Sequence, residues 1–573
     1  MRTTKGAAIL ATSAAMALVL GACSGGGNGG GGGDDAGGGG GEGAVVEGDG
    51  DVIDINSHTR EDLEQGGTLR IAIGEGLPSQ WNPMHVNGNE GDIDDVRDLM
   101  AVRMWDYDAE GVPSPNPNYL EDYEVDDSGD QQVVTLNLNP DAVWNSGESI
   151  TWEDVAATLT ICDGTNDVQC VQTGPYEAIE SVEQGENEFQ VVITYDGIRP
   201  DWQSPLDEVV PASAIADDQM FNERWLEYHE EDWTGPYVID DINDAQQIIT
   251  LVPNENWWGD APLLDEVQFH AMSTESQPNA FQNGELDAFE VGPDPNAYNT
   301  ASQVADAEIR TAAAPDWRHV TFNSEAGVLQ ELEVRQAIQK GINREAIAAS
   351  DLAGLPEELQ LQLGNHLYVN GQDGYQDNTG EFAYDPDAAS AQLEEAGWEM
   401  NEETGIRERD GEPLQVRFMV LTGVPVSENE GQLIQEQLRE IGIDVQLQQQ
   451  DVATWGEALS NGDFQMIAFS WLGTQYPLAN IAQIYGNPET NESNYANLNN
   501  PELNELIREV DSEADPERRT ELANEVDQMI WESGHTLPLY QRPQIYATVS
   551  NLANYGAYGF HQMRPENWGY VAE

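Results

Sequence analysis

The sequence predicts an α/β protein with two lobes, and three observations support this fold class. The chain has 573 residues, more than one simple core holds, so two or more lobes are expected. Hydrophobic residues make up 39% of it and 15 residues are tryptophan, which is enough for a packed interior. The second half alternates strand-like and helix-like segments, as βαβ units do.

Local patterns mark several elements in the first half. Alternating apolar residues predict strands at 69–73, 133–138 and 189–195. Thr151 is a suitable helix N-cap, and Asp154 lies at the third helical position, where a carboxylate can cap back.

Start and stop signals mark the elements of the second half. Asp385 is expected to cap a helix that has Pro386 in its first turn and ends at Gly397. A βαβ unit follows, with strands expected at 414–420 and 443–447. The helix between them is expected to be capped by Ser427 and to stop at Gly442. Its buried face would consist of Ile434, Leu438 and Ile441.

The N-terminus has the features of an exported lipoprotein. Two basic residues, Arg2 and Lys5, precede an apolar stretch that is too short to span a membrane. Leu20-Gly21-Ala22-Cys23 matches the bacterial lipobox, so residues 1–22 are expected to be a signal peptide and Cys23 to be lipidated; an ordinary signal peptide with an incidental cysteine is the alternative. Residues 23–65, rich in glycine and acidic residues, are expected to form a flexible tether.

The other two cysteines, Cys162 and Cys170, lie in the exported part of the chain. In an oxidising compartment they can close a small disulfide loop, and two free buried thiols are the alternative.

The charge is extreme, with 105 acidic against 22 basic residues and a net charge of −83. Such a surface repels nucleic-acid phosphates, so no nucleic-acid partner is expected. The self-repulsion requires screening by salt, which is typical of proteins from salt-loving organisms; a generally acidic secreted protein is the alternative.

Several short blocks resemble one protein family in their order and spacing. These are Gly67-Thr68-Leu69, Trp81-Asn82-Pro83, residues 143–147 with 151–155, residues 234–237, residues 254–259, Gly284-Glu285-Leu286-Asp287, Phe322-Asn323, and residues 334–338 with 343–345. From about Gly66 onwards the chain resembles the family 5 solute-binding proteins of ABC importers for peptides and nickel, and more closely an actinobacterial lipoprotein branch of that family.

The resemblance implies a two-lobed type II periplasmic-binding-protein fold with an inserted subdomain. Lobe I is expected at 66–318, including the subdomain, with the C-terminal residues 538–573 returning to it. Lobe II is expected at 319–537. A solute, most simply an oligopeptide or peptide-like compound, would bind between the lobes and be delivered to an ABC permease in the membrane by a lipid-anchored monomer. A cell-envelope regulator that binds a protein or glycolipid-related partner is the alternative.

Ligands of α/β sheets bind beyond the carboxyl ends of strands, so we expect ligand-binding residues directly after a buried strand at 464–470. These are Trp471, Thr474, Gln475 and Tyr476. Asn323 and Trp81 are further expected ligand-binding residues. In peptide-binding relatives an aspartate that pairs with the peptide amine stands where this chain has Thr474. Trp471 is a candidate stacking surface, and packing of the hinge is its alternative role.

Enzyme motifs are missing from the sequence. There is neither a Gly-x-Ser-x-Gly elbow nor a His-Glu-x-x-His pair, and the eight histidines are scattered. We therefore expect no catalytic residue, no cofactor and no metal site.

Overall fold

The computed structural model describes residues 53–74, 76–88, 91–171, 173–422, 424–479, 481–491 and 493–572. One mixed sheet runs through the whole molecule. Its strands, in spatial order, are β10 (Tyr237–Asn243), β11 (Ile248–Pro253), β12 (Glu266–Ala271), β1 (Thr68–Ile73), β13 (Ala288–Glu290), β21 (Thr536–Val549), β14 (Ala307–Phe322), β20 (Met466–Trp471), β18 (Gln415–Leu421) and β19 (Asp444–Gln450).

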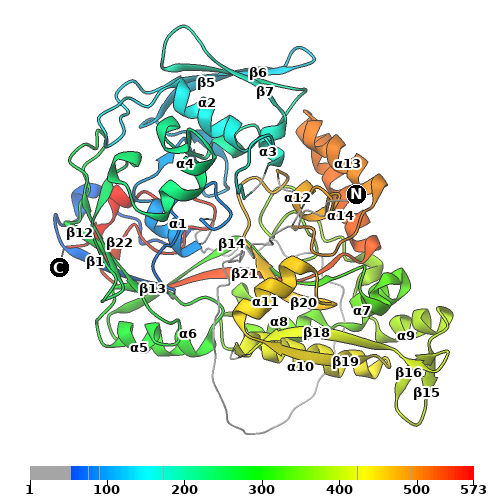
Figure 1. The fold of residues 1–573 in the computed structure, drawn as a ribbon. Coiled ribbons are helices and arrows are strands. Elements are labelled where there is room, and N and C mark those ends of the chain that lie inside the picture. The colour runs from blue at the N-terminus through cyan, green and yellow to red at the C-terminus, as the bar shows by residue number, and fades with distance from the viewer. Residues whose placement is uncertain are drawn as a thin grey trace, which may run out of the picture.

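Two long antiparallel strands, β14 and β21, hold the halves of this sheet together (Figure 1). β13 of the first half pairs with β21, and β20 of the second half pairs with β14. The fold is therefore α/β and two-lobed, as predicted. The predicted lobe boundaries at 318/319 and 537/538 fall inside these two strands and stay predictions.

The first lobe adds a separate four-stranded antiparallel sheet, at the top of Figure 1. It consists of β5 (Leu120–Asp126), β6 (Gln132–Leu138), β8 (Gln190–Tyr195) and β7 (Ile179–Gln184). The strands predicted at 133–138 and 189–195 are confirmed as β6 and β8. The predicted capping box is confirmed too: Thr151 caps α2 (Trp152–Ile161), and Asp154 accepts the N–H of Thr151.

Smaller elements complete the first lobe. Its other helices are α1 (Gly91–Arg97), α3 (Gly174–Glu177), α4 (Asp218–Glu223), α5 (Gln277–Gln282) and α6 (Pro295–Ala301). Short paired strands are β2 (Val102–Arg103) with β9 (Glu208–Val209), β3 (Trp105–Tyr107) with β4 (Pro113–Pro115), and β22 (Leu552–Ala553) with β23 (Gly569–Tyr570).

The second lobe contains the predicted βαβ unit, because β18 and β19 are parallel neighbours joined by α10 (Pro425–Glu440). Ile434, Leu438 and Ile441 are buried, as predicted. The helix starts earlier than expected, with Val424 as its N-cap. Ser427 lies inside the first turn, where its hydroxyl accepts the N–H of Leu421 at 3.0 Å and ties the helix to β18.

The described part of the second lobe has seven further helices. They are α7 (Leu332–Gly341), α8 (Arg344–Asp351), α9 (Pro386–Glu395), α11 (Val452–Asn461), α12 (Ile481–Tyr485), α13 (Pro501–Ser512) and α14 (Pro516–Ser533). The cap predicted for α9 is confirmed, since Asp385 accepts the N–H of Ala388. A small sheet of β15 (Glu399–Asn401), β16 (Ile406–Arg409) and β17 (Glu412–Pro413) follows α9.

The folded part of the chain begins before the predicted Gly66. Asp54 pairs with Ala557 and Leu63 pairs with Val571, so this part of the predicted tether lies against the C-terminal segment. Ile55 and Leu63 are buried there. Cys23 and the signal peptide 1–22 lie outside the described residues. No helix in the described part of the chain combines the length and hydrophobicity needed to cross a bilayer.

A disulfide joins Cys162, the C-cap of α2, to Cys170, and the two Cα atoms lie 5.9 Å apart. The backbone of Cys170 also pairs with that of His85, so the closed loop is attached to a second segment of the first lobe.

Replacing both cysteines by alanine should lower the free energy of unfolding by about 2.5 kcal/mol, because the unfolded chain regains the entropy of a short loop. Urea unfolding of the variant and of the wild type, each with and without reductant, measures this. Reductant should affect only the wild type. Complete alkylation of both thiols in the unreduced wild type would contradict the disulfide.

Candidate functional site

Trp471 ends β20 and pairs with Trp317 of β14. Its indole lies parallel to the imidazole of His319, with ring centroids 5.9 Å apart, and parallel to the ring of Tyr495 at the same separation of 5.9 Å. His319 is fully buried, and burial lowers the pKa of its imidazole well below the usual value. Trp471 is thus half-buried in an aromatic cluster at the strand end.

The chain after Trp471 passes very close to β14. Gly473 donates its N–H to Asp316 Oδ1 at 3.0 Å. A Cβ atom at Gly473 would lie 2.3 Å from the carbonyl oxygen of Pro315, so the close approach requires glycine. Thr474 is exposed, and its hydroxyl accepts the N–H of Tyr476 at 3.2 Å.

Gln475 and Tyr476 reach across to the first lobe. Gln475 Nε2 donates to the carbonyl oxygen of Phe560 at 3.3 Å. The hydroxyl oxygens of Tyr476 and Tyr107 lie 3.3 Å apart, and Tyr107 also donates to Asp207 at 2.9 Å. Burial raises the pKa of both phenols, so both stay protonated. The segment 471–476 therefore lies where the two lobes meet.

The other two predicted ligand-binding residues lie elsewhere. Trp81 is in the core of the first lobe, with its ring against Tyr228 and Trp233 at centroid distances of 5.6 and 6.3 Å. Its position is fixed by packing with other aromatic residues, so it does not join the segment 471–476.

Asn323 lies at the opposite end of β20 from Trp471. Phe322 pairs with Met466, the first residue of β20, and Asn323 is one residue further, so it is roughly 20 Å from Trp471 along the strand. The Asn323 amide donates to the carbonyl oxygens of Gly462 and Phe464 at 2.9 and 3.1 Å. It lines a polar cavity of about 330 Å³ and holds two loops together there.

A second contact between the lobes is ionic and was not predicted. Arg519 of α14 forms two parallel hydrogen bonds to Asp201, which follows β8, with N–O distances of 2.8 and 2.5 Å. Both side chains are largely buried, at 12% and 19% exposure. Burial raises the pKa of the neighbouring Asp511 to about 6, against the opposing effect of Arg199 and Arg519. Asp201 precedes Trp202, which packs against Trp105.

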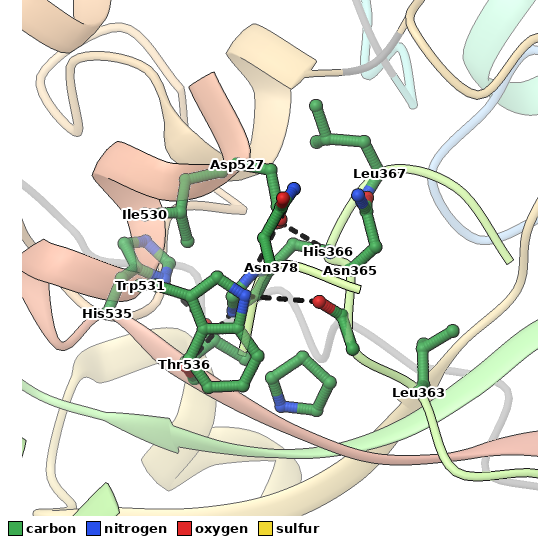
Figure 2. A network of polar contacts seen from close by, with 12 residues as sticks. Leu363, Asn365, His366, Leu367, Asn378, Asp527, Ile530, Trp531, His535 and Thr536 are labelled. Carbon is green, nitrogen blue, oxygen red and sulfur yellow. Dashed lines mark hydrogen bonds and ion pairs between the residues drawn. The ribbon is translucent and has the colours of Figure 1, made fainter. Parts of the chain in front are cut away.

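A buried polar network stabilises the second lobe (Figure 2). His366 Nδ1 lies 2.7 Å from Asp527 Oδ1, and His366 Nε2 lies 3.1 Å from the carbonyl oxygen of Thr536. Both ring nitrogens of His366 therefore lie within hydrogen-bond distance of oxygen atoms. Asn378 donates to Asp527 Oδ2 at 2.7 Å. The network joins the loop that carries His366 and Asn378 to α14 and β21. The side chains of His366 and Asp527 are fully buried, so the network lies inside the lobe.

In the described part of the chain, no three His, Cys, Asp or Glu side chains are grouped so that they could hold a metal ion.

Comparison with known proteins agrees with this architecture. The family model of bacterial extracellular solute-binding proteins, family 5, matches residues 114–492. The chain is 32% identical over 516 residues to the oligopeptide-binding protein OppA of Mycobacterium tuberculosis, which covers 89% of this chain and 86% of that protein. It is 24% identical over 425 residues to the oligopeptide-binding protein AppA of Bacillus subtilis, covering 72% of this chain and 76% of AppA.

Solved structures share the fold over nearly the whole chain. The periplasmic EDTA-binding protein EppA superposes with a TM-score of 0.83 at 21% identity, covering 93% of this chain and 100% of EppA. AppA of Bacillus subtilis in complex with a nonapeptide superposes with a TM-score of 0.76 at 22% identity, covering 89% of this chain and 100% of AppA. The chain belongs to the family 5 bacterial extracellular solute-binding proteins and is the solute-binding component of an ABC importer.

Proposed function

We propose that this protein binds an oligopeptide or a peptide-like solute outside the cell membrane and delivers it to the permease of its importer. The relative at 32% identity over most of the chain is an oligopeptide-binding protein, which supports this class of solute. The observation that carries the proposal is the position of Trp471–Tyr476 at the junction of the lobes, with contacts to β14 and to Phe560 and Tyr107 of the first lobe. The protein acts by binding and release, as a monomer, and breaks no bond in the solute.

The lobes close around the solute when it binds. Contacts that cross between lobes can form only when the lobes are together, so each favours the closed state by its own free energy. The contacts of Tyr476 with Tyr107, of Gln475 with Phe560 and of Arg519 with Asp201 are of this kind. The solute supplies the remaining stabilisation by contacting both lobes.

Membrane attachment through Cys23 belongs to the same proposal. The lipobox at residues 20–23 supports it, because several acyl chains on one cysteine give stable anchoring. Cys23→Ala should release the protein from the membrane fraction or stall its processing. Metabolic labelling with palmitate followed by membrane fractionation measures both. A labelled, membrane-bound Cys23→Ala protein would refute the anchor.

The peptide-binding proposal predicts that tetra-alanine binds the purified protein and changes its tryptophan fluorescence. Trp471→Phe, which keeps an aromatic ring in the cluster, should weaken binding by about 1 kcal/mol, the scale of an aromatic contact. Calorimetric titration measures affinity. Trp398→Phe is the control, since Trp398 is buried among the helices of the second lobe beside Arg409. Equal affinities of wild type and Trp471→Phe would place the site elsewhere.

The ionic contact between lobes gives a separate test of closure. Arg519→Gln should weaken solute binding by about 3- to 30-fold, because a largely buried bidentate pair favours the closed state. Arg518→Gln is the matched control, since Arg518 lies on the same helix, is 46% exposed and pairs with Glu521 and Glu525.

Small-angle X-ray scattering of the same variants distinguishes closure from direct contact with solute. The radius of gyration of Arg519→Gln with solute should exceed that of the wild type and of Arg518→Gln. If all three proteins agree in both affinity and radius, the Arg519–Asp201 pair does not stabilise the closed state.

A further inference from the structure

Two carboxylates of one short segment of the first lobe, Asp201 and Asp207, lie at contacts between the lobes. Asp201 pairs directly with Arg519 of α14. Asp207 accepts the hydroxyl of Tyr107 at 2.9 Å, and the hydroxyl oxygen of Tyr107 lies 3.3 Å from that of Tyr476. The segment therefore reaches α14 through one carboxylate and the chain after β20 through the other.

Packing and backbone pairing fix this segment in the first lobe. Trp202 is buried, and its ring lies against Trp105 and Tyr123 at centroid distances of 5.4 and 5.1 Å. The residue after Asp207 pairs with Arg103 in the ladder between β2 and β9. These contacts lie within the first lobe, so they position Asp207 in the open state as well as in the closed one.

An arginine holds the second oxygen of Asp207. Arg103 Nη1 donates to Asp207 Oδ2 at 3.2 Å, which leaves Oδ1 for the Tyr107 hydroxyl. Arg103 also forms ion pairs with Asp98 and Glu208, and its side chain is 16% exposed. The guanidinium group thus orients the Asp207 carboxylate toward Tyr107.

The Tyr107 hydroxyl has one proton and two oxygen neighbours. The carboxylate of Asp207 can only accept a hydrogen bond, and it is the closer neighbour. A hydrogen bond to a charged acceptor is also roughly twice as strong as one to a neutral hydroxyl, so the proton goes to Asp207. The contact with Tyr476 then requires Tyr476 to donate and the Tyr107 oxygen to accept. Hydrogen bonds in a chain polarise one another, so the charge of Asp207 makes that oxygen a better acceptor.

The two phenols meet in a place that favours this bond. Tyr107 is buried, and the rings of Tyr107 and Tyr476 pack edge to face with centroids 6.0 Å apart. Burial raises the pKa of both phenols, and the nearby charge of Asp207 raises it too, so both hydroxyls keep their protons at neutral pH. Phenylalanine at either position keeps the ring contact and removes only the hydroxyl.

We propose that Asp207 is the positioning residue of the interlobe contact between Tyr107 and Tyr476. It takes the Tyr107 proton and so presents the Tyr107 oxygen to the Tyr476 hydroxyl as the lobes close. The inference rests on the proposed function, since it assigns a residue to the closure that accompanies solute binding. Asp207 acts through Tyr107 and needs no contact with the solute. Because the contact forms only when the lobes are together, it stabilises the closed state.

A double-mutant cycle tests this coupling, with tetra-alanine as the solute and calorimetry as the measure of affinity. In the wild type, Tyr476→Phe should weaken binding by about 2- to 12-fold, the scale of one hydrogen bond. In Asp207→Ala the Tyr107 hydroxyl is no longer oriented, so Tyr476→Phe should weaken binding by less than about twofold. The Asp207 side chain is 38% exposed, so alanine leaves no closed cavity. In Asp207→Asn an oxygen can still accept the Tyr107 proton, and Tyr476→Phe should cost more than it does in Asp207→Ala.

Stopped-flow tryptophan fluorescence gives a readout that a general loss of structure would not produce. Asp207→Ala should raise the dissociation rate of tetra-alanine and leave its association rate unchanged, because the contact forms after the solute has entered. Asp126→Asn is the matched control. Asp126 of β5 also accepts a hydroxyl, that of Ser128 at 2.6 Å, but it lies in the four-stranded sheet of the first lobe. Both rates should stay as in the wild type.

The outcomes separate this inference from the proposed function. Equal costs of Tyr476→Phe in the wild type and in Asp207→Ala overturn the role of Asp207 and leave peptide binding intact. A fall in the association rate of Asp207→Ala with no change in its dissociation rate overturns that role as well. A wild type that does not bind tetra-alanine overturns the proposed function and this inference with it.

Discussion

The pairing of β14 with β21 is the constraint on which both lobes depend. The ladder runs from Ala307 opposite Val549 to Thr321 opposite Thr536 and carries the other strands on its two edges. A regular ladder resists bending, so relative movement of the lobes is most easily absorbed where the ladder is interrupted, between Ala313 and Trp317. The same interruption brings Asp316 to Gly473. A solute at the proposed site, Trp471–Tyr476, would lie beside this interruption of the ladder.

Charge is the second constraint, because the sequence contains only 22 basic residues and 105 acidic ones. Arginines occur at junctions between segments that are distant in sequence. Arg70 of β1 binds Asp287, which directly precedes the neighbouring strand β13. Arg318 binds the fully buried Glu430 of α10, and Arg519 binds Asp201 of the other lobe. The guanidinium fork suits such paired contacts. Salt screens the long-range repulsion among exposed acids, whereas partly buried pairs are screened much less. Ionic strength should therefore affect the surface more than these junctions.

Local signals explain what could be predicted from the sequence. Alternation located β18 and β19, and the caps at Thr151 and Asp385 were correct because capping depends on neighbouring residues only. Longer-range effects explain the differences. Ser427 resembles a cap, but the helix begins with Pro425, and the hydroxyl bonds to β18. The acidic, glycine-rich composition before Gly66 hides Leu63, which is buried against a segment some 500 residues later in the chain.

In the candidate site, too, local signals predicted some features, and long-range contacts determine the others. Gln475 and Tyr476 were predicted from their place after a buried strand, and they do lie at the junction of the lobes. The contact of Asp316 with Gly473 could not be predicted, because it depends on the register between strands about 150 residues apart and on a bulge that no local pattern marks. The contact fixes the segment after β20 through its backbone, because Asp316 accepts the Gly473 N–H and a side chain at residue 473 would collide with the Pro315 carbonyl oxygen. A change in the bulge of β14 would therefore displace Gln475 and Tyr476 from their contacts with the first lobe.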